Sequence, residues 1–187
     1  MKTIAVCIIN YNTRDLLREC LHSILVQDAD EIVVVDNASR DCSVEMMRTE
    51  FPSITLIALG KNLGFGAASN RGIKACYAEQ IVLLNADTRM QPGSLQALRH
   101  YLENHPQAAI IGPRLLNPDS TLQTSCFHFP TPLHILLYIS GLYRLMPRLP
   151  ILKQRTLQKM TSESARPVPW ILGAALAFRR ETFEGLG

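Results

Sequence analysis

The chain has 187 residues, of which 47% are hydrophobic and 19% charged, and these proportions suit one substantial globular domain and exclude a disordered chain. The net charge of +3 at pH 7 does not indicate a nucleic-acid partner, although it is compatible with anionic substrates. Five scattered cysteines, none in a C-x-x-C pair, argue against a disulfide framework and a zinc site and favour a reducing compartment. We expect neither a signal peptide nor a transmembrane span.

Apolar segments alternate with helical patterns along the first 112 residues. Five segments are typical of buried strands: 4–9, 31–35, 54–59, 81–84 and 108–111. Helices are predicted between them, with Asn12 capping the first, Ser39 or Asp41 capping the second, a Gly-rich turn at Gly64 opening the third and Pro92 opening the fourth. This alternation predicts βαβ units, and therefore an α/β fold with a mainly parallel sheet flanked by helices.

The alternation ends after Pro113. Residues 115–125 predict a hairpin with its turn at 117–120, and residues 168–180 predict further strands. The apolar stretch 133–146, followed by Arg148, Lys153 and Arg155, has two interpretations. It is either a helix packed on the sheet or over an acceptor cleft, or an interfacial patch that approaches a membrane.

Polar side chains cluster directly after four successive predicted strands. They are Tyr11 and Asn12, then Asp36, Asn37 and Ser39, then Lys61 and Asn62, and finally Asn85 and Asp87. Each of these residue types also caps helices and forms turns. Because the carboxyl ends of parallel strands share one edge of a sheet, their recurrence favours a ligand-binding edge.

Asp87 follows the apolar run 81–84 within the turn 85–88. A carboxylate in this place can hold a hard divalent cation, which in turn can hold a phosphate. The alternative is that Asp87 only caps the turn before Pro92.

The small-residue segment 62–70 opens a predicted helix, and its glycines allow close backbone approach to an anion. It only faintly matches the dinucleotide fingerprint, because it follows the third strand and not the first. A nicotinamide-dependent enzyme is therefore disfavoured.

Five segments in order resemble the motifs of family 2 glycosyltransferases, and most closely the bacterial rhamnosyltransferase-like members with the GT-A fold. They are residues 8–12, 34–39, 62–66, 84–87 and 170–174. The resemblance covers nearly the whole chain. It implies a single GT-A domain over residues 1–187, with a nucleotide-sugar-binding half (1–112) and an incomplete acceptor-side half (113–187).

The resemblance also implies roles for residues of the nucleotide site. Asp36 would accept a hydrogen bond from the base, while Tyr11 and Asn12 would line the nucleoside pocket. Asn62 and Asn70 would lie near the ribose and the diphosphate.

The same resemblance implies a metal site and an acceptor side. Asp87 matches the last acid of the family's D-x-D motif, and Asn85, grouped with the nucleotide-binding residues, stands in place of the first. We therefore expect weak, donor-dependent binding of Mg²⁺ or Mn²⁺. Trp170, Gly173 and Ala174 match the acceptor-side motif.

An inverting sugar transfer needs a general base. The resemblance implies that this base lies beyond Gly187, so we expect a truncated transferase that retains most of its donor site. Glu181 and Glu184 are the nearest acidic candidates in the chain, and they suit a helix start better.

The predicted function is transfer of a sugar, rhamnose by resemblance, from a nucleotide-diphosphate donor to a saccharide or lipid-linked acceptor in cell-surface polysaccharide synthesis. The expected location is the cytoplasm, with peripheral contact at the inner membrane face left open. Two alternatives also stay open. One is a non-catalytic nucleotide-sugar-binding remnant. The other is a sugar-phosphate nucleotidyltransferase, which would need a Gly-rich basic loop where residues 10–14 stand.

Overall fold

The computed structural model describes residues 2–127, 129, 131–141 and 165–186. Contacts divide the chain into two compact units, Met1–Pro113 with Gly173–Gly187, and Arg114–Leu172. Residues 173–187 thus belong with the first unit, whereas the sequence analysis assigned them to the acceptor-side half. The physical reason is a strand that this segment contributes to the sheet of the first unit.

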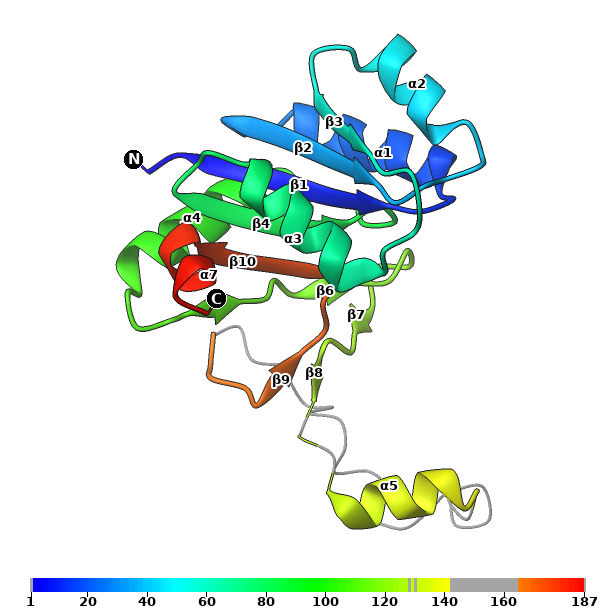
Figure 1. The fold of residues 1–187 in the computed structure, drawn as a ribbon. Coiled ribbons are helices and arrows are strands. Elements are labelled where there is room, and N and C mark those ends of the chain that lie inside the picture. The colour runs from blue at the N-terminus through cyan, green and yellow to red at the C-terminus, as the bar shows by residue number, and fades with distance from the viewer. Residues whose placement is uncertain (1, 128, 130, 142–164, 187) are drawn as a thin grey trace. The chain divides into compact units, whose positions relative to one another are not determined.

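The first unit is built on a six-stranded sheet with the order β3-β2-β1-β4-β10-β5 (Figure 1). Its strands are β1 (Ile4–Asn10), β2 (Glu31–Asp36), β3 (Thr55–Ala58), β4 (Gln80–Asn85), β5 (Ile110–Ile111) and β10 (Ala175–Arg179). Strands β1 to β4 pair in parallel, and β10 is antiparallel to both of its neighbours. The predicted α/β fold with a mainly parallel sheet is therefore confirmed.

Strand β10 lies between β4 and β5, although the chain returns to it only after residue 172. Its register pairs Ala175 with Leu84 and Arg179 with Gln80. Ala175, Ala177 and Phe178 are buried, which suits an inner strand covered on both faces. Because β10 runs antiparallel, it begins at the edge of the sheet where β4 ends.

Helices cover both faces of this sheet (Figure 1). They are α1 (Arg14–Leu25), α2 (Ser43–Glu50), α3 (Phe65–Ala75), α4 (Ser94–Asn104) and α7 (Arg180–Leu186). On one face, α3 and Phe183 of α7 pack on a buried cluster that includes Cys7, Val33 and Leu83. The other face is covered by α1 and α4, whose apolar sides are buried. Alternate strand residues therefore point into two separate layers of core.

The predicted helix caps at Asn12 and Ser39 are wrong, whereas the alternative cap Asp41 accepts the N–H of Ser43, the first residue of α2, at 3.1 Å. α1 begins after Thr13, because Asn12 has a φ of 55° and its amide oxygen accepts the N–H of Arg40 at 2.8 Å. Before α2, Ser39 does not cap the helix, since its hydroxyl accepts the N–H of Asn12 at 2.9 Å. Both side chains are used to shape the loops of one sheet edge.

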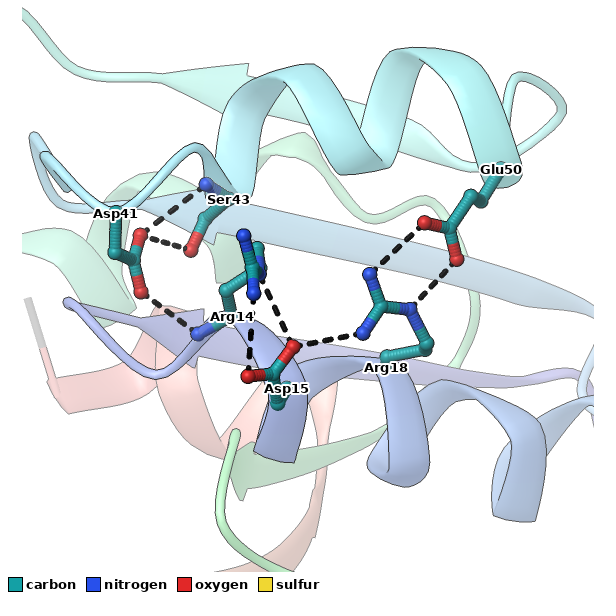
Figure 2. Close-up of polar contacts among 6 residues, drawn as sticks. All are labelled: Arg14, Asp15, Arg18, Asp41, Ser43 and Glu50. Atoms are coloured by element: carbon teal, nitrogen blue, oxygen red, sulfur yellow. Dashed lines mark hydrogen bonds and ion pairs between the residues drawn. The ribbon is translucent and has the colours of Figure 1, made fainter.

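Charged side chains tie α1 to α2 on the surface (Figure 2). Arg18 of α1 donates to both carboxylate oxygens of Glu50 at 2.7 and 2.9 Å, and to Asp15 at 2.8 Å. The hydrogen bonds from Arg18 hold the pKa of Glu50 below its usual value. Because these groups are partly exposed, the network contributes little stability, and its carboxylates are already paired with arginine.

Within its described residues, the second unit contains two short antiparallel pairs and the helix α5 (Pro132–Ile139). β6 (Leu115–Leu116) pairs with β7 (Leu122–Gln123), and β8 (Cys126–Phe127) pairs with β9 (Trp170–Ile171). The predicted hairpin over 115–125 and the predicted strands within 168–180 are thereby confirmed. The helix α5 covers part of the predicted apolar segment, and residues 142–146 of that segment lie outside the described residues. No helix in the described ranges is long and apolar enough to cross a membrane.

We expect Gly72→Ala to lower the free energy of unfolding. A Cβ atom at Gly72 of α3 would lie 2.3 Å from Cys7 Sγ and 2.8 Å from Val35 Cγ2, so α3 would have to move away from the sheet. Overpacking of this kind costs about 1–3 kcal/mol, measurable by urea unfolding. Gly66→Ala in the same helix is the matched control, since a Cβ there meets nothing within 4 Å. Equal unfolding midpoints for the two variants would contradict this packing.

Asp41→Asn should destabilise the fold in a pH-dependent way. Partial burial alone would raise the pKa of Asp41, but hydrogen bonds from the Ser43 hydroxyl and the Arg14 N–H outweigh it and hold the pKa below its usual value (Figure 2). A carboxylate with a lowered folded-state pKa stabilises the fold above its unfolded-state pKa, and that contribution is lost as pH falls through the folded-state pKa. The stability difference between variant and native chain should therefore be present at neutral pH and shrink below about pH 4. A difference independent of pH in chemical denaturation would argue against this role.

Candidate functional site

One edge of the sheet in the first unit collects the carboxyl ends of β1 to β4 and the start of β10. β1 pairs Asn10 with Asp36 of β2 on one side, and Ile9 with Asn85 of β4 on the other. The loops that follow these strands therefore leave the sheet side by side. Open α/β sheets bind their ligands at such an edge.

The carboxylate of Asp36 is held in a network of neutral donors and is only 1% exposed. Its Oδ1 accepts from Nδ2 of Asn10 at 2.8 Å, and its Oδ2 accepts from the N–H of Ser39 at 2.9 Å. The Ser39 hydroxyl in turn accepts from Asn10 at 3.1 Å and from the N–H of Asn12 at 2.9 Å. Asp36 thus fixes the shape of both loops, and each of its oxygens retains capacity for a further hydrogen bond.

Tyr11 and Asn12 lie in the loop that this network holds. Both are exposed, and the left-handed backbone of Asn12 turns the chain sharply after β1. An exposed tyrosine ring offers a face on which a planar ring can stack. The structure therefore brings Tyr11, Asn12 and Asp36 together at one place, as the sequence analysis grouped them.

Asn37 links the end of β2 to the loop before α3. Its Oδ1 accepts the N–H of Leu63 at 2.9 Å, and its Nδ2 donates to Oδ1 of Asn62 at 3.0 Å. That same Asn62 oxygen accepts the N–H of Gly64 at 2.8 Å. The side chain of Asn70 lies exposed on α3 and makes no hydrogen bond within the part of the chain that the structure describes. The loop of Asn62 is therefore held rigidly, whereas Asn70 is free to meet a ligand.

The start of α3 presents backbone donors at the same edge. The first bond of the helix runs from the N–H of Ala68 to the carbonyl of Gly64 at 3.2 Å. The N–H groups of Phe65, Gly66 and Ala67 precede that bond, and all three residues are exposed. Such a terminus favours an anion.

Sequence reasoning did not name Asn10 as a site residue, and it noted Asn37 and Ser39 only as members of the strand-end cluster. Their side chains connect the loops after β1, β2 and β3. The sequence signal that could have identified them is an amide or hydroxyl side chain directly after an apolar strand, because a buried polar group there needs hydrogen-bond partners.

Asp87 lies in the turn after β4 with its side chain exposed, and it forms no hydrogen bond or ion pair with the described residues. The described residues contain no group of three or more His, Cys, Asp or Glu that could hold a metal. Among the described residues at this edge, Asp87 therefore offers an exposed carboxylate without a partner, whereas the carboxylate of Asp36 is buried and hydrogen-bonded. That donor set fits a Mg²⁺ or Mn²⁺ ion whose other ligands are water and a diphosphate.

The side chain of Asn85 does not present its oxygen to a ligand at the surface, since its Oδ1 is buried and has no hydrogen-bond partner among the described residues. Cys20 Sγ lies 4.0 Å from the carbonyl oxygen of Asn85. Burial, with a smaller contribution from the negative charge of Asp87, raises the pKa of the Cys20 thiol to about 12. A carboxylate at position 85 would be energetically costly in such poorly solvated surroundings, and the neutral amide of Asn85 avoids that desolvation cost.

Two of the predicted acceptor residues reach the same edge. The carbonyl of Ala174 accepts the N–H of Asn85 at 3.0 Å, and a Cβ on Gly173 would lie 4.0 Å from Cε1 of Phe65. Trp170 belongs to the second unit, where its half-exposed ring packs on Phe127 with 4.7 Å between ring centroids.

Glu181 and Glu184 lie at the opposite edge of the sheet. α7 starts where β10 ends, and β10 ends beside Gln80, the first residue of β4. The length of β4, about 16 Å, therefore separates α7 from the turn of Asp87. Glu181 pairs with Arg179 at 3.1 Å and Glu184 with Arg180 at 3.9 Å, so both carboxylates have structural partners.

The family model for glycosyl transferase family 2 matches residues 5–162. Among curated relatives, the N-acetylglucosaminyl-diphospho-decaprenol L-rhamnosyltransferase of Mycobacterium tuberculosis is 28% identical over 171 residues, covering 83% of this chain and 54% of the relative. The amylovoran biosynthesis glycosyltransferase AmsE of Erwinia amylovora is 27% identical over 124 residues, covering 64% of this chain and 47% of the relative. The chain thus spans about half the length of these relatives.

Solved structures share the fold. The mannosyltransferase PcManGT from Pyrobaculum calidifontis, in complex with GDP-Man and Mn²⁺, matches with a TM-score of 0.64 and 22% identity, over 100% of this chain and 47% of that chain. S. aureus TarS 1-349 in complex with UDP-GlcNAc matches with a TM-score of 0.55 and 22% identity, over 68% of this chain and 38% of that chain. The expected GT-A fold is confirmed. From the match over residues 5–162 and the motifs in their expected order, the chain belongs to family 2 of the glycosyltransferases.

Proposed function

We propose that this chain binds a nucleotide-diphosphate sugar and supplies the donor side of a sugar transfer to a saccharide or lipid-linked acceptor. Membership of the family supports the class of reaction. The observation that carries the proposal is the unpaired, exposed carboxylate of Asp87, which follows β4 at the edge that also holds the polar loops after β1 and β2. An unpaired, exposed carboxylate beside loops that hydrogen bonds hold in place suits a metal ion carried by a ligand with its own negative charge.

The nucleoside would occupy the loops after β1 and β2. The exposed ring of Tyr11 would stack on the base, Asn12 would line the pocket, and Asp36 would accept from the base. Asn62 and Asn70 would lie near the ribose and the diphosphate. The exposed N–H groups at the start of α3 support that position for the diphosphate.

Asp87 would hold the metal ion. The oxygen-only donor set favours Mg²⁺ or Mn²⁺, and Mn²⁺ accompanies GDP-Man in the mannosyltransferase that shares this fold. Such an ion offsets the negative charge that develops on the leaving diphosphate. Asn85 would contribute by keeping the turn next to Ala174 in place, which its backbone N–H supports.

Rhamnose is our proposed sugar and inversion our proposed stereochemistry. The name of the Mycobacterium relative, a rhamnosyltransferase acting on a decaprenol-linked sugar, supports a lipid-linked acceptor, and the name of AmsE supports polysaccharide synthesis. Trp170, Gly173 and Ala174 would face the acceptor. We place the reaction in the cytoplasm at the inner membrane face. Glu181 and Glu184 pair with Arg179 and Arg180 away from the site, so we assign neither of them as the general base.

Asp87→Ala should weaken binding of a nucleoside diphosphate in Mn²⁺ by about tenfold or more, because it removes the exposed carboxylate that would bind the cation. We would titrate dTDP, UDP and GDP by calorimetry, with Mn²⁺ and with EDTA. In EDTA the variant and the native chain should bind equally. Asp28→Ala, which changes an exposed carboxylate bonded to Gln96, is the control. An equal loss in the control, or a loss that persists in EDTA, would refute the metal role.

Asn37→Ala should lower nucleotide affinity about tenfold whether or not Mn²⁺ is present, since it releases the loop of Asn62 and leaves the part-buried N–H of Leu63 without its acceptor. This independence from the metal separates its effect from that of Asp87→Ala. Asn104→Ala, at an exposed asparagine bonded only to its own helix, serves as the control. If a folded Asn37→Ala chain binds as tightly as the native one, the loop does not contribute to the site.

A further inference from the structure

A groove lies between the helix α2 and β3, which is the outermost strand of its sheet (Figure 1). The groove has a volume of about 460 Å³ and is here called the α2–β3 groove. Met47, Arg48 and Phe51 line it from α2 and its C-terminal end, and Leu56 and Ala58 line it from β3. The side chains of Met47 and Phe51 are buried and make much of this lining apolar.

The α2–β3 groove belongs to the first unit alone. The chain leaves that unit after Pro113 and returns to it at Gly173, beside β5 and β10. Those two strands are at the opposite end of the strand order from β3. The groove is therefore defined by residues of the first unit only.

Strand β3 leaves backbone hydrogen-bonding groups open at the edge of the sheet. In a parallel pair, alternate residues of a strand bond to the neighbouring strand. The N–H of Leu59, just after β3, donates to the carbonyl of Asp36 in β2 at 2.9 Å, so Ile57 also faces β2. The N–H and C=O groups of Leu56 and Ala58 therefore point away from the sheet, where another strand can pair with them.

Arg48 gives the groove a positive charge that has no ion-pair partner among the described residues. Its side chain is exposed and makes no hydrogen bond within the same part of the chain. The nearby carboxylate of Glu50 is already bonded by Arg18 at 2.7 and 2.9 Å. A guanidinium beside an apolar lining suits a carboxylate that lies close to an apolar side chain.

These features together fit an extended peptide. Open N–H and C=O groups of an edge strand bind the backbone of an added strand, whose side chains alternate between the two faces of the sheet. Residues two positions apart in the added strand thus share the face of α2. A second copy of the chain paired through β3 would not supply the carboxylate, because β3 contains no Asp or Glu.

We propose that β3 and the α2–β3 groove bind an extended segment of a partner protein, in which an apolar residue lies two positions from an Asp or Glu. The segment adds a strand to the sheet at Leu56 and Ala58. Its apolar side chain fills the groove, and its carboxylate pairs with Arg48. This interaction goes beyond the proposed function, and nucleotide binding at the edge of Asp87 does not depend on it.

Peptide binding to the full chain tests the proposal. The probes are the fluorescein-labelled peptide TVTLTET, whose Leu and Glu are two positions apart, and TVTLTKT, which carries Lys in place of that Glu. In fluorescence anisotropy the native chain should bind TVTLTET about fivefold more tightly than TVTLTKT. In hydrogen exchange followed by NMR, the amides of Leu56 and Ala58 should become protected when TVTLTET binds.

Two variants separate the charge from the backbone pairing. Arg48→Glu should reverse the preference, so that TVTLTKT binds more tightly. Ala58→Pro removes an outward N–H at an edge position that tolerates proline, and it should weaken both peptides about fivefold without changing the preference. Lys74→Glu makes the same charge change as Arg48→Glu at an exposed lysine of α3, and it should keep the native preference.

Four results would overturn the proposal. They are no binding of either peptide by the native chain, equal affinity for the two, a preference that Lys74→Glu reverses as Arg48→Glu does, or a dimer in ultracentrifugation that Ala58→Pro dissociates. A cooperative thermal melt shows that each variant is folded, and the reversal by Arg48→Glu decides the matter if Ala58→Pro does not fold. Nucleotide titration of Arg48→Glu should match that of the native chain.

Discussion

The parallel register of β1 with β2 and β4 is the constraint on which the candidate site depends. Pairing Asn10 with Asp36 brings the Asn10 amide within 2.8 Å of a buried carboxylate, and pairing Ile9 with Asn85 sets the Asp87 turn alongside. A slip of one residue would turn every side chain of a strand to the other face. The fully buried side chains of β1 hold that register, so core packing and site geometry have the same cause.

The start of strand β10 completes the sheet edge that forms the candidate site. Because it runs antiparallel beside β4, the carbonyl of Ala174 meets the N–H of Asn85 at the site edge, while α7 begins at the opposite edge. A segment distant in sequence therefore supports the turn that carries Asp87. The same geometry assigns Glu181 and Glu184 to ion pairs with Arg179 and Arg180.

Much of this arrangement followed from local sequence, because long apolar strands and Gly-rich turns are defined by their own residues. The strands around Ile8 and Leu84, and the hairpin after Pro113, are examples. The role of Asn12 could not be predicted, since its partner Arg40 belongs to a different loop. The position of β10 in the sheet could not be predicted either, because the residues of a short strand do not indicate which strands it will pair with. The burial of Asp36 depends on donors from Asn10 and Ser39 that no local pattern reveals.

The described residues of the site combine neutral amides with the unpaired carboxylate of Asp87, so metal and diphosphate should bind together and not separately. The most direct measurement is anomalous diffraction from crystals of the chain grown with dTDP and Mn²⁺. Our account predicts an anomalous peak between the Asp87 carboxylate and the diphosphate, with the base against the loops of Tyr11 and Asp36. A manganese peak away from Asp87, or a nucleotide bound at another part of the molecule, would contradict it.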